Sequence, residues 1–435
     1  MKKSAVLATL TALFCVMAIP AYAEQTNPGE TRFELSLKGQ KEGDVNPDTG
    51  AVLSRDDLHP SIKENTSADK IRLGRLLEQA RQREEDQQDA DKPQTRSTAR
   101  SSDIGINYCR QLGSPSGSMP NRHNFCYNDT ATVKAMRCRP ICVPVSKAEF
   151  QVTVWGRGTN GAREIDVSTM LSDFKITGDE VKDEKLEIRM SCEREHSEAP
   201  QCPNRTRARS KTIGNWKDPL ERVWTETFTS AEGGITDEVL SYYKLKTEVV
   251  FPQGQSALIT TDFRCDSSAK AAKGKGCIFQ GRVPTWTIPI MKPDGTTPSP
   301  VQELAQHVLD ALYRPEQTVP YQEDKDLPGS QGSGRPLHRL YSGTPEYNDN
   351  RAATSRICKQ EWTADERRGK DCDEYPMAST REGLRSGEGS VRPINPSHNR
   401  VGGTNLKNWY EHYRIVQDDP FYVVVLYGGE LEKFS

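Results

Sequence analysis

The sequence predicts an exported chain with a disulfide-stapled, mostly β segment followed by an α+β C-terminal domain. Three observations support this class. Short apolar segments in the middle of the chain alternate with polar residues at a period of two, as in half-buried strands. Ten cysteines remain once an N-terminal leader is removed, an even number suited to disulfides. The last 40 residues read as an amphipathic helix and then an apolar strand.

Composition limits the class of protein further. The 435 residues suggest two or three domains. Only 34% are hydrophobic, with 27 Pro and 32 Gly, which excludes a multi-pass membrane protein and one uniform core. Charge is nearly balanced, with 59 Lys and Arg against 61 Asp and Glu. Any binding of nucleic acid must therefore come from a local patch or from metal ions.

Residues 1–23 have the pattern of a signal peptide. Lys2 and Lys3 precede an apolar run too short to span a bilayer, and Ala21-Tyr22-Ala23 provides a small-x-small cleavage site. We expect a secreted or periplasmic protein with no membrane span after cleavage. An uncleaved anchor is the alternative. A lipoprotein is disfavoured because Cys15 lies within the apolar run, behind the bulky Phe14.

The remaining cysteines are expected to form disulfides, as is usual in exported proteins. Sequence neighbours suggest three pairs, each closing a short polar loop: Cys192–Cys202, Cys265–Cys277 and Cys358–Cys372. A zinc site at Cys138 and Cys142 is the weaker alternative, because no second Cys/His pair follows at finger spacing.

The next two segments differ in composition. Residues 24–105 are expected to be poorly ordered and polar, with one short helix around residues 71–80. Residues 106–291 are expected to form an antiparallel β domain of unknown role. Its strands are predicted from five segments: 150–154, 186–190, 245–249, 258–263 and 286–290.

Residues 292–435 are predicted to form the C-terminal domain. A helix should begin at Ser299-Pro300 and end before Pro315, with apolar residues at helical spacing. His307 on this helix is expected to be an ordinary surface or half-buried histidine. An Asn-bearing loop then leads through Gly402-Gly403 into a second helix, and residues 421–426 should form a buried strand.

The acidic segment Asp371-Cys372-Asp373-Glu374-Tyr375-Pro376-Met377-Ala378 is the candidate for chemistry. On an extended backbone Asp371 and Asp373 share one face and Glu374 takes the other. A carboxylate held in a partly desolvated setting can act as a general base or bind a metal. The alternative is a solvated acidic turn.

This segment, followed by Asn395-Pro396-Ser397-His398-Asn399-Arg400-x-Gly402-Gly403, resembles the signature of the NucA/NucB family of secreted bacterial deoxyribonucleases. The spacing of 26 positions from Asp373 to Asn399 is compatible with that family. The close resemblance covers about residues 355–427. It implies a ββα-metal fold and a metal-dependent endonuclease that hydrolyses DNA phosphodiester bonds with little sequence preference.

Carried over residue by residue, the resemblance gives Asp373 as the general base and Asn399 as the ligand of one divalent ion. The expected ion is Mg²⁺ or Mn²⁺, because both ions prefer hard oxygen ligands. Glu374 would hold the waters of the ion or orient Asp373. Arg400 and Arg381 are candidates for phosphate contact, because a guanidinium matches phosphate oxygens.

One departure from the family pattern concerns His398, which stands where many members have Asp or Glu. It is expected to support the site by a hydrogen bond, to take over as base, or to mark a weaker enzyme.

Two other functions are alternatives to a DNA-hydrolysing enzyme. One is a catalytically inactive envelope or secreted binding protein that keeps the fold. The other is a secreted nuclease toxin, which would have an immunity or inhibitor protein as a partner.

Overall fold

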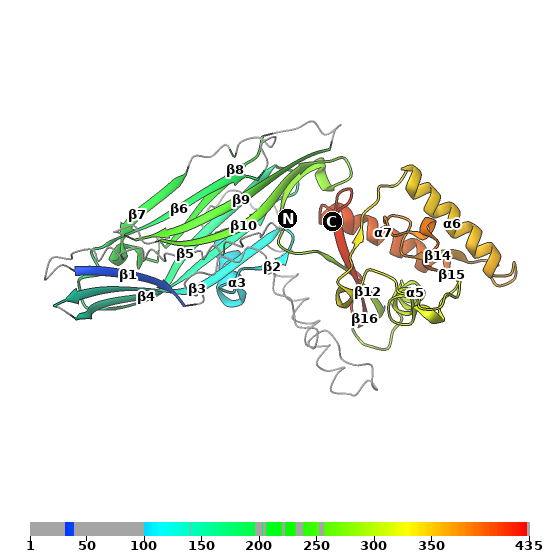
Figure 1. Ribbon diagram of the computed structural model, residues 1–435, viewed down its shortest axis with the longest axis horizontal. Helices are drawn as coiled ribbons and strands as arrows, with labels where there is room; N and C mark the ends of the chain where they lie inside the picture. Colours follow the sequence, from blue (N-terminus) through cyan, green and yellow to red (C-terminus); the bar gives the residue numbers. More distant parts are fainter. Residues whose placement is uncertain are drawn as a thin grey trace, which may run out of the picture.

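A computed structural model describes residues 31–38, 100–139, 141–195, 202, 206–219, 222–231, 238–251 and 256–432. The predicted signal peptide and the predicted helix around residues 71–80 lie outside these ranges. The described part of the chain forms a β sandwich and a C-terminal α+β unit, which lie end to end along the long axis (Figure 1).

The first sheet of the sandwich has the strand order β1-β3-β4-β5-β8, with β2 paired to β3. Its pairings are all antiparallel. The strands are β1 (Thr31–Leu37), β2 (Ser118–Asn121), β3 (Asn124–Cys138), β4 (Cys142–Gly158), β5 (Glu164–Thr177) and β8 (Val223–Thr229). Helix α3 (Arg100–Leu112) packs on the outer face, where Ile106 contacts Trp155 and Met170.

The second sheet has the order β11-β10-β9-β6-β7 and is also antiparallel. Its strands are β6 (Lys185–Arg194), β7 (Arg207–Thr212), β9 (Val239–Val250), β10 (Ser256–Ser267) and β11 (Lys275–Phe279). Between β7 and β8 lies α4 (Ile213–Trp216), and the 3-10 helix η1 (Ala272–Gly274) precedes β11. The inward side chains of both sheets form one core, in which Phe150, Trp216 and Phe263 are fully buried.

The period-two segments predicted the strands of the sandwich. Segments 150–154, 186–190, 245–249 and 258–263 lie in β4, β6, β9 and β10. One expectation is wrong at its N-terminal end: residues 24–105 are not uniformly unstructured, because β1 pairs with β3 along its whole length. Phe33 and Leu37 of β1 are buried in the sandwich core, and Leu35 packs against it. These three alternating apolar residues alone were too few to predict a strand.

Five disulfides staple the described chain. The three predicted pairs are confirmed, Cys192–Cys202, Cys265–Cys277 and Cys358–Cys372. Cys109–Cys126 ties α3 to β3. Cys138–Cys142 closes the turn between β3 and β4, so these two thiols are not a zinc site.

The C-terminal unit is built around a three-stranded sheet of order β12-β16-β13 and the separate hairpin β14–β15. Its strands are β12 (Thr285–Met291), β13 (Leu337–His338), β14 (Asp371–Tyr375), β15 (Ser390–Ile394) and β16 (Pro420–Gly428). Its helices are α5 (Gln302–Tyr313), α6 (Pro345–Glu361), α7 (Pro396–His412) and the 3-10 turns η2 (Pro315–Gln317), η3 (Gln331–Ser333) and η4 (Leu384–Ser386).

Strand β12 belongs to this C-terminal unit, although the apolar pattern of residues 286–290 predicted a strand of the β domain. It pairs in parallel with β16, and Trp286 and Ile288 lie in the same core as Trp409 and Phe421. The structural division therefore falls before residue 285 and not after residue 291. Helix α5 starts at Gln302, later than predicted, because Ser299 and Val301 form a turn in which the Ser299 hydroxyl accepts the Val301 N–H.

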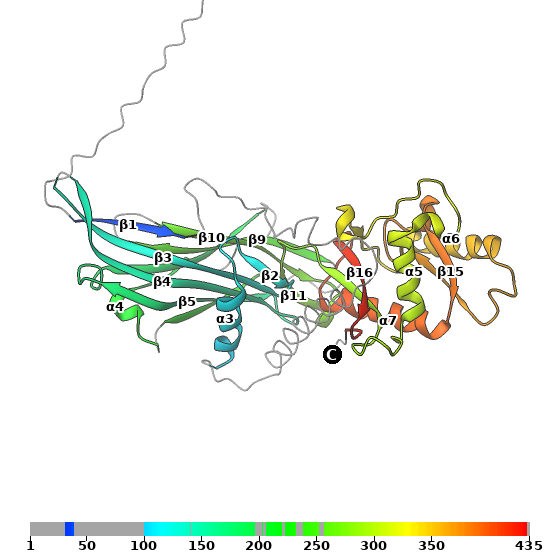
Figure 2. The same ribbon diagram turned by 90° about the horizontal axis from the view of Figure 1, so that it is seen from below.

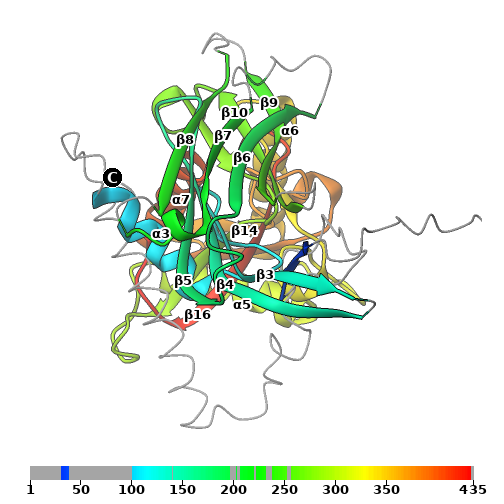
Figure 3. The same ribbon diagram turned by 90° about the vertical axis from the view of Figure 1, so that its left-hand side faces the viewer.

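The junction between the two units is polar and buried. We call its five charged residues the junction network: Arg122, Arg264, Asp266, Arg414 and Asp419. Asp419, just before β16, accepts from Arg264 at 2.8 Å and from Arg122 at 3.0 Å. Asp266 of β10 lies between Arg264 and Arg414. Seen from the sandwich end, the C-terminal elements lie behind the two sheets (Figure 3).

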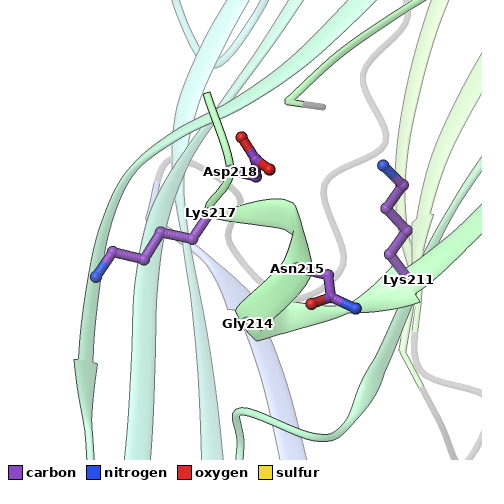
Figure 4. Close-up of a pocket in the computed structure, with 5 residues that line it drawn as sticks. All are labelled: Lys211, Gly214, Asn215, Lys217 and Asp218. Atoms are coloured by element: carbon purple, nitrogen blue, oxygen red, sulfur yellow. The ribbon is translucent and has the colours of Figure 1, made fainter. Parts of the chain in front are cut away.

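An open hollow of about 670 Å³ lies beside α4 (Figure 4). Lys211, Lys217 and Asp218 line it, together with Gly214 and Asn215. Figure 2 places α4 at the end of the sandwich away from the C-terminal unit, so the hollow is no part of the site described next. No helix among the described residues is long and apolar enough to cross a bilayer.

Candidate active site

The hairpin β14–β15 and the following helix α7 carry the residues singled out in the sequence. The hairpin is antiparallel, and Asp373 lies opposite Arg392 in it. Tyr375 anchors β14, since its ring is fully buried and its hydroxyl donates to the Pro328 carbonyl at 2.8 Å. Cys358–Cys372 ties β14 to α6. The backbone that presents the acidic residues is thus fixed on two sides.

Asp373 is the buried carboxylate of this hairpin. It is 5% exposed, and its Oδ2 lies 2.6 Å from Nδ1 of His307 on α5. No described residue donates a hydrogen bond to its Oδ1. One oxygen is therefore held by the protein and the other is left for a ligand. The carboxylate has the partly desolvated setting that the sequence predicted, and it is no solvated acidic turn.

Asp371 lies on the same face of β14 as Asp373, as the alternation predicted. Its carboxylate pairs with Arg400 of α7, with Nε of the guanidinium 3.1 Å from Oδ2. Glu374 is directed to the other side of the strand, where its Oε1 accepts the Ala378 N–H at 3.1 Å. Burial and the neighbouring Asp373 raise the pKa of Glu374 to about 7.

The start of α7 places Asn399 on a helix and not in the loop that the sequence predicted. Asn395 caps the helix by accepting the Ser397 N–H at 2.8 Å, and Pro396 occupies the first turn. The helix therefore begins six residues before Gly402. The side-chain amide of Asn399 forms no hydrogen bond with any described residue, so its oxygen is available to a ligand.

His398 faces the N-terminus of α5. Its Nδ1 accepts the Glu303 N–H at 3.4 Å and lies 3.8 Å from the Glu303 carboxylate. The ring is half-buried. Because Nδ1 accepts this N–H, Nε2 is the ring nitrogen left to donate a hydrogen bond to another group.

The two candidate phosphate-binding arginines have different surroundings. The Arg400 side chain is 74% exposed and is joined to β14 through Asp371. Arg381 is bound by Asp418 and also lies 3.7 Å from Glu346. The structure thus brings Arg400 to the hairpin that carries Asp373, whereas Arg381 is engaged by two carboxylates of other elements.

Sequence reasoning missed His307. It was expected at the surface or half-buried, and this expectation is wrong: the ring is fully buried between Asp373 and Ser390. Glu303, His307 and Asp310 recur at i, i+4 and i+7, so they form a polar stripe along α5. That spacing was readable in the sequence, but the apolar stripe of the same helix, which packs in the core, gave the stronger signal.

The donor set can be compared with the needs of a divalent ion. No cluster of three or more His, Cys, Asp or Glu side chains suited to a metal occurs in the part of the chain described here. Oδ1 of Asp373 and the amide oxygen of Asn399 are two site oxygens that accept no hydrogen bond from the described residues. Neutral and anionic oxygens suit Mg²⁺, which keeps several waters and needs few protein ligands. In their chemistry these two oxygens therefore suit a hydrated ion with few protein ligands.

A polar site on the α+β unit thus combines a buried carboxylate on a β hairpin, an amide on the next helix that makes no hydrogen bond to the described residues, and an exposed arginine. Residues 341–424 match the family model described as Deoxyribonuclease NucA/NucB. The resemblance to that family is thus confirmed for this C-terminal segment, which contains β14, β15 and α7. The comparison with curated proteins gave no match, and the comparison with solved structures gave none either.

Proposed function

We propose that the C-terminal unit is a metal-dependent endonuclease that hydrolyses DNA phosphodiester bonds. The observation that carries the proposal is the family match over residues 341–424, which coincides with the segment that presents Asp373 and Asn399. The order of hairpin and helix, β14-β15-α7, is the order that a ββα-metal nuclease requires.

In this proposal Asp373 is the general base. Its held oxygen fixes the carboxylate, and the remaining oxygen takes a proton from the attacking water. Asn399 would hold the ion, Mg²⁺ or Mn²⁺, through its amide oxygen. When bound, the ion stabilises the negative charge that develops on the phosphate oxygens. Glu374 lies beside Asp373 in the chain and is proposed to orient it or to hold waters of the site.

His398 and Arg400 would contact the substrate backbone. A neutral His398 with Nδ1 engaged can donate from Nε2 to a phosphate oxygen, and an exposed guanidinium matches the same group. Because these contacts are to phosphates and not to bases, we expect little sequence preference. Arg381 is proposed as a weaker phosphate contact, since Asp418 and Glu346 already engage it.

We infer that the protein acts outside the cytoplasm, either in the periplasm or after secretion. Five disulfides in the described chain support this, because such bonds persist in oxidising compartments. The pattern of residues 1–23 is the second support.

A plasmid assay tests the enzyme. The purified mature chain should nick supercoiled DNA with Mg²⁺ or Mn²⁺ and stop when a chelator is added. Asp373→Asn keeps the shape of the side chain and its contact to His307, yet should lower kcat by about 10²–10⁴-fold, the usual contribution of a general base. Asp365→Asn is the matched control, because that carboxylate is on the surface and its one ion pair with a described residue is with Arg368.

An inactive binding protein remains the second candidate. It is favoured by the sparse donor set, since the described residues hold no cluster of three metal-ligating side chains. Such a protein would slow the migration of DNA in a mobility-shift assay, and it would not cut the DNA whichever divalent metal is added. Cutting that survives Asp373→Asn would instead show that another residue is the base.

A further inference from the structure

We propose that His307, held by Ser390, is a positioning residue that fixes the carboxylate of Asp373 for catalysis. The inference rests on the proposed role of Asp373 as a base. The family-matched segment, residues 341–424, does not include His307, because α5 ends before residue 341. The site would therefore extend beyond the segment that defines the family.

The geometry forms one hydrogen-bonded chain across three elements. His307 of α5 has Nδ1 2.6 Å from Oδ2 of Asp373 on β14, and Nε2 2.7 Å from Oγ of Ser390 on β15. An ionised carboxylate can only accept, so Nδ1 carries the proton and donates it. In the neutral ring Nε2 then accepts from the Ser390 hydroxyl. Every polar atom of the imidazole is satisfied.

Burial makes this chain rigid. His307 is fully buried, Ser390 is 1% exposed and Asp373 is 5% exposed. A buried polar group that is fully hydrogen-bonded specifies one arrangement, because any other leaves a donor or an acceptor unpaired. The imidazole thus fixes the torsion of the Asp373 carboxylate and leaves its Oδ1 in one place.

The rest of the α5 stripe holds the imidazole in position. At one end, Oε2 of Glu303 accepts the Asn395 N–H at 2.8 Å, next to the start of α7. At the other, Asp310 pairs with Arg392 of β15 at 2.9 Å. The helix is therefore docked on both sides of His307 by polar contacts to the same hairpin and helix that carry the site.

A serine, a histidine and an aspartate connected in this order also occur in acyl-transfer enzymes. Here an acyl-transfer role is excluded, because a substrate cannot reach the serine. Ser390 and His307 are buried, so no substrate carbonyl can reach Oγ. The hydrogen-bonded chain from Ser390 through His307 ends at Oδ2 of Asp373, so it acts by positioning that carboxylate.

Two substitutions separate positioning from general stability. In His307→Asn the amide nitrogen stands near the former Nδ1 and can still donate to Asp373. In His307→Gln the amide stands near the former Nε2, so it can reach Ser390 but not Asp373. Both variants leave a smaller, neutral polar side chain in the same buried space, and both should lose stability.

The measurement is kcat and KM for plasmid or oligonucleotide DNA at saturating Mn²⁺, corrected for the folded fraction by circular dichroism. We expect His307→Gln to lower kcat by on the order of 10²-fold with little change in KM, because a misplaced reacting group has about that effect. His307→Asn should retain most of kcat. Equal losses in the two variants would overturn the inference while leaving the nuclease intact.

A second readout does not need activity. The His307 Nδ1 proton should give a downfield nuclear magnetic resonance signal that moves upfield in Asp373→Asn, since the acceptor loses its charge. His123, whose Nε2 donates to the His412 carbonyl oxygen at 2.9 Å, is the internal control, and its signal should not change. An unmoved His307 signal would contradict the proposed contact. A wild-type protein that cuts no DNA would overturn the proposed function, and the inference with it.

Discussion

At the scale of single residues, Glu374 gives a pH-dependent prediction. Its folded pKa of about 7 lies above the ordinary value near 4.3, so the folded state prefers the protonated form. Stability should therefore fall as pH rises from about 4 to 7 and stay low above that. Glu374→Gln, which can still accept the Ala378 N–H, should stabilise the protein at pH 8 by about 1–3 kcal/mol and much less at pH 5.

Thermal melts with a chelator present check this, because a bound cation would itself favour the ionised carboxylate. Glu388→Gln is the control, since Glu388 is exposed in the connection between β14 and β15. A gain in Tm that is equal at pH 5 and pH 8 would contradict the prediction.

Arg400 and Arg381 give a second prediction at this scale. Because Arg400 is exposed beside the hairpin, Arg400→Ala should weaken DNA binding and reduce the slope of log affinity against log salt by about 1. Arg381→Ala should leave that slope nearly unchanged, since Asp418 and Glu346 hold its side chain. Titrations at several salt concentrations measure both. Equal slopes in the two variants would argue against the assignment to Arg400.

The residues of the site were only partly predictable from the sequence. Alternation along β14 was enough to separate Asp373 from Glu374, because the period of a strand is a local property. The partner of Asp373 was not predictable in the same way. His307 lies 66 positions earlier in the chain, and its contact depends on how α5 docks.

At the scale of elements, the glycine pair of α7 gives a matched test. A Cβ on Gly402 would lie 2.0 Å from Cδ2 of the buried Leu304 on α5, whereas a Cβ on Gly403 would meet nothing within 4 Å. Gly402→Ala should therefore cost about 1–3 kcal/mol by overpacking. Gly403→Ala should stabilise the helix by about 0.5–1 kcal/mol. Urea unfolding measures both, and the same sign for the two would contradict the packing described.

Helical spacing predicted the interior of α7 but not its start. Leu406, Trp409 and Tyr410 are buried on one face as expected. The helix reaches back to Pro396 because Asn395 and Pro396 form a good N-terminus, a signal that the nearby glycine pair obscured. Strand β12 shows the other limit: its apolar pattern predicted a strand, but its partner β16 lies more than 130 positions away.

At the scale of the whole molecule, the loss of one charge from the junction network should strongly destabilise the folded protein. Asp266 is fully buried against Arg264 and Arg414. Asp266→Asn would leave two buried guanidinium groups short of negative charge, at a cost of about 3–5 kcal/mol. The exposed pair is the comparison: Asp365→Ala should cost about 0–1 kcal/mol. Chemical unfolding of the full chain tests the difference, and similar losses would contradict it.

Acid should weaken the same junction. Burial alone would raise the pKa of Asp419, but Arg122 and Arg264 outweigh it and hold the pKa below its usual value. Its stabilising contribution is present above the unfolded pKa near 3.9 and is lost as pH falls through the lower folded pKa. Asp419→Asn should therefore reduce the loss of Tm between pH 4 and pH 2. An acid profile identical to that of the wild type would count against this.

The polar stripe of α5 has a consequence for anyone who moves this domain between proteins. A cassette cut at the borders of the family-matched segment, residues 341–424, would omit His307, the edge strand β12 and the end of the central strand β16. Such a fragment would contain Asp373 and Asn399 but would lack the imidazole of His307 that contacts Asp373. Grafts, chimaeras and expression fragments should therefore begin upstream of Thr285, so that they include β12 and α5.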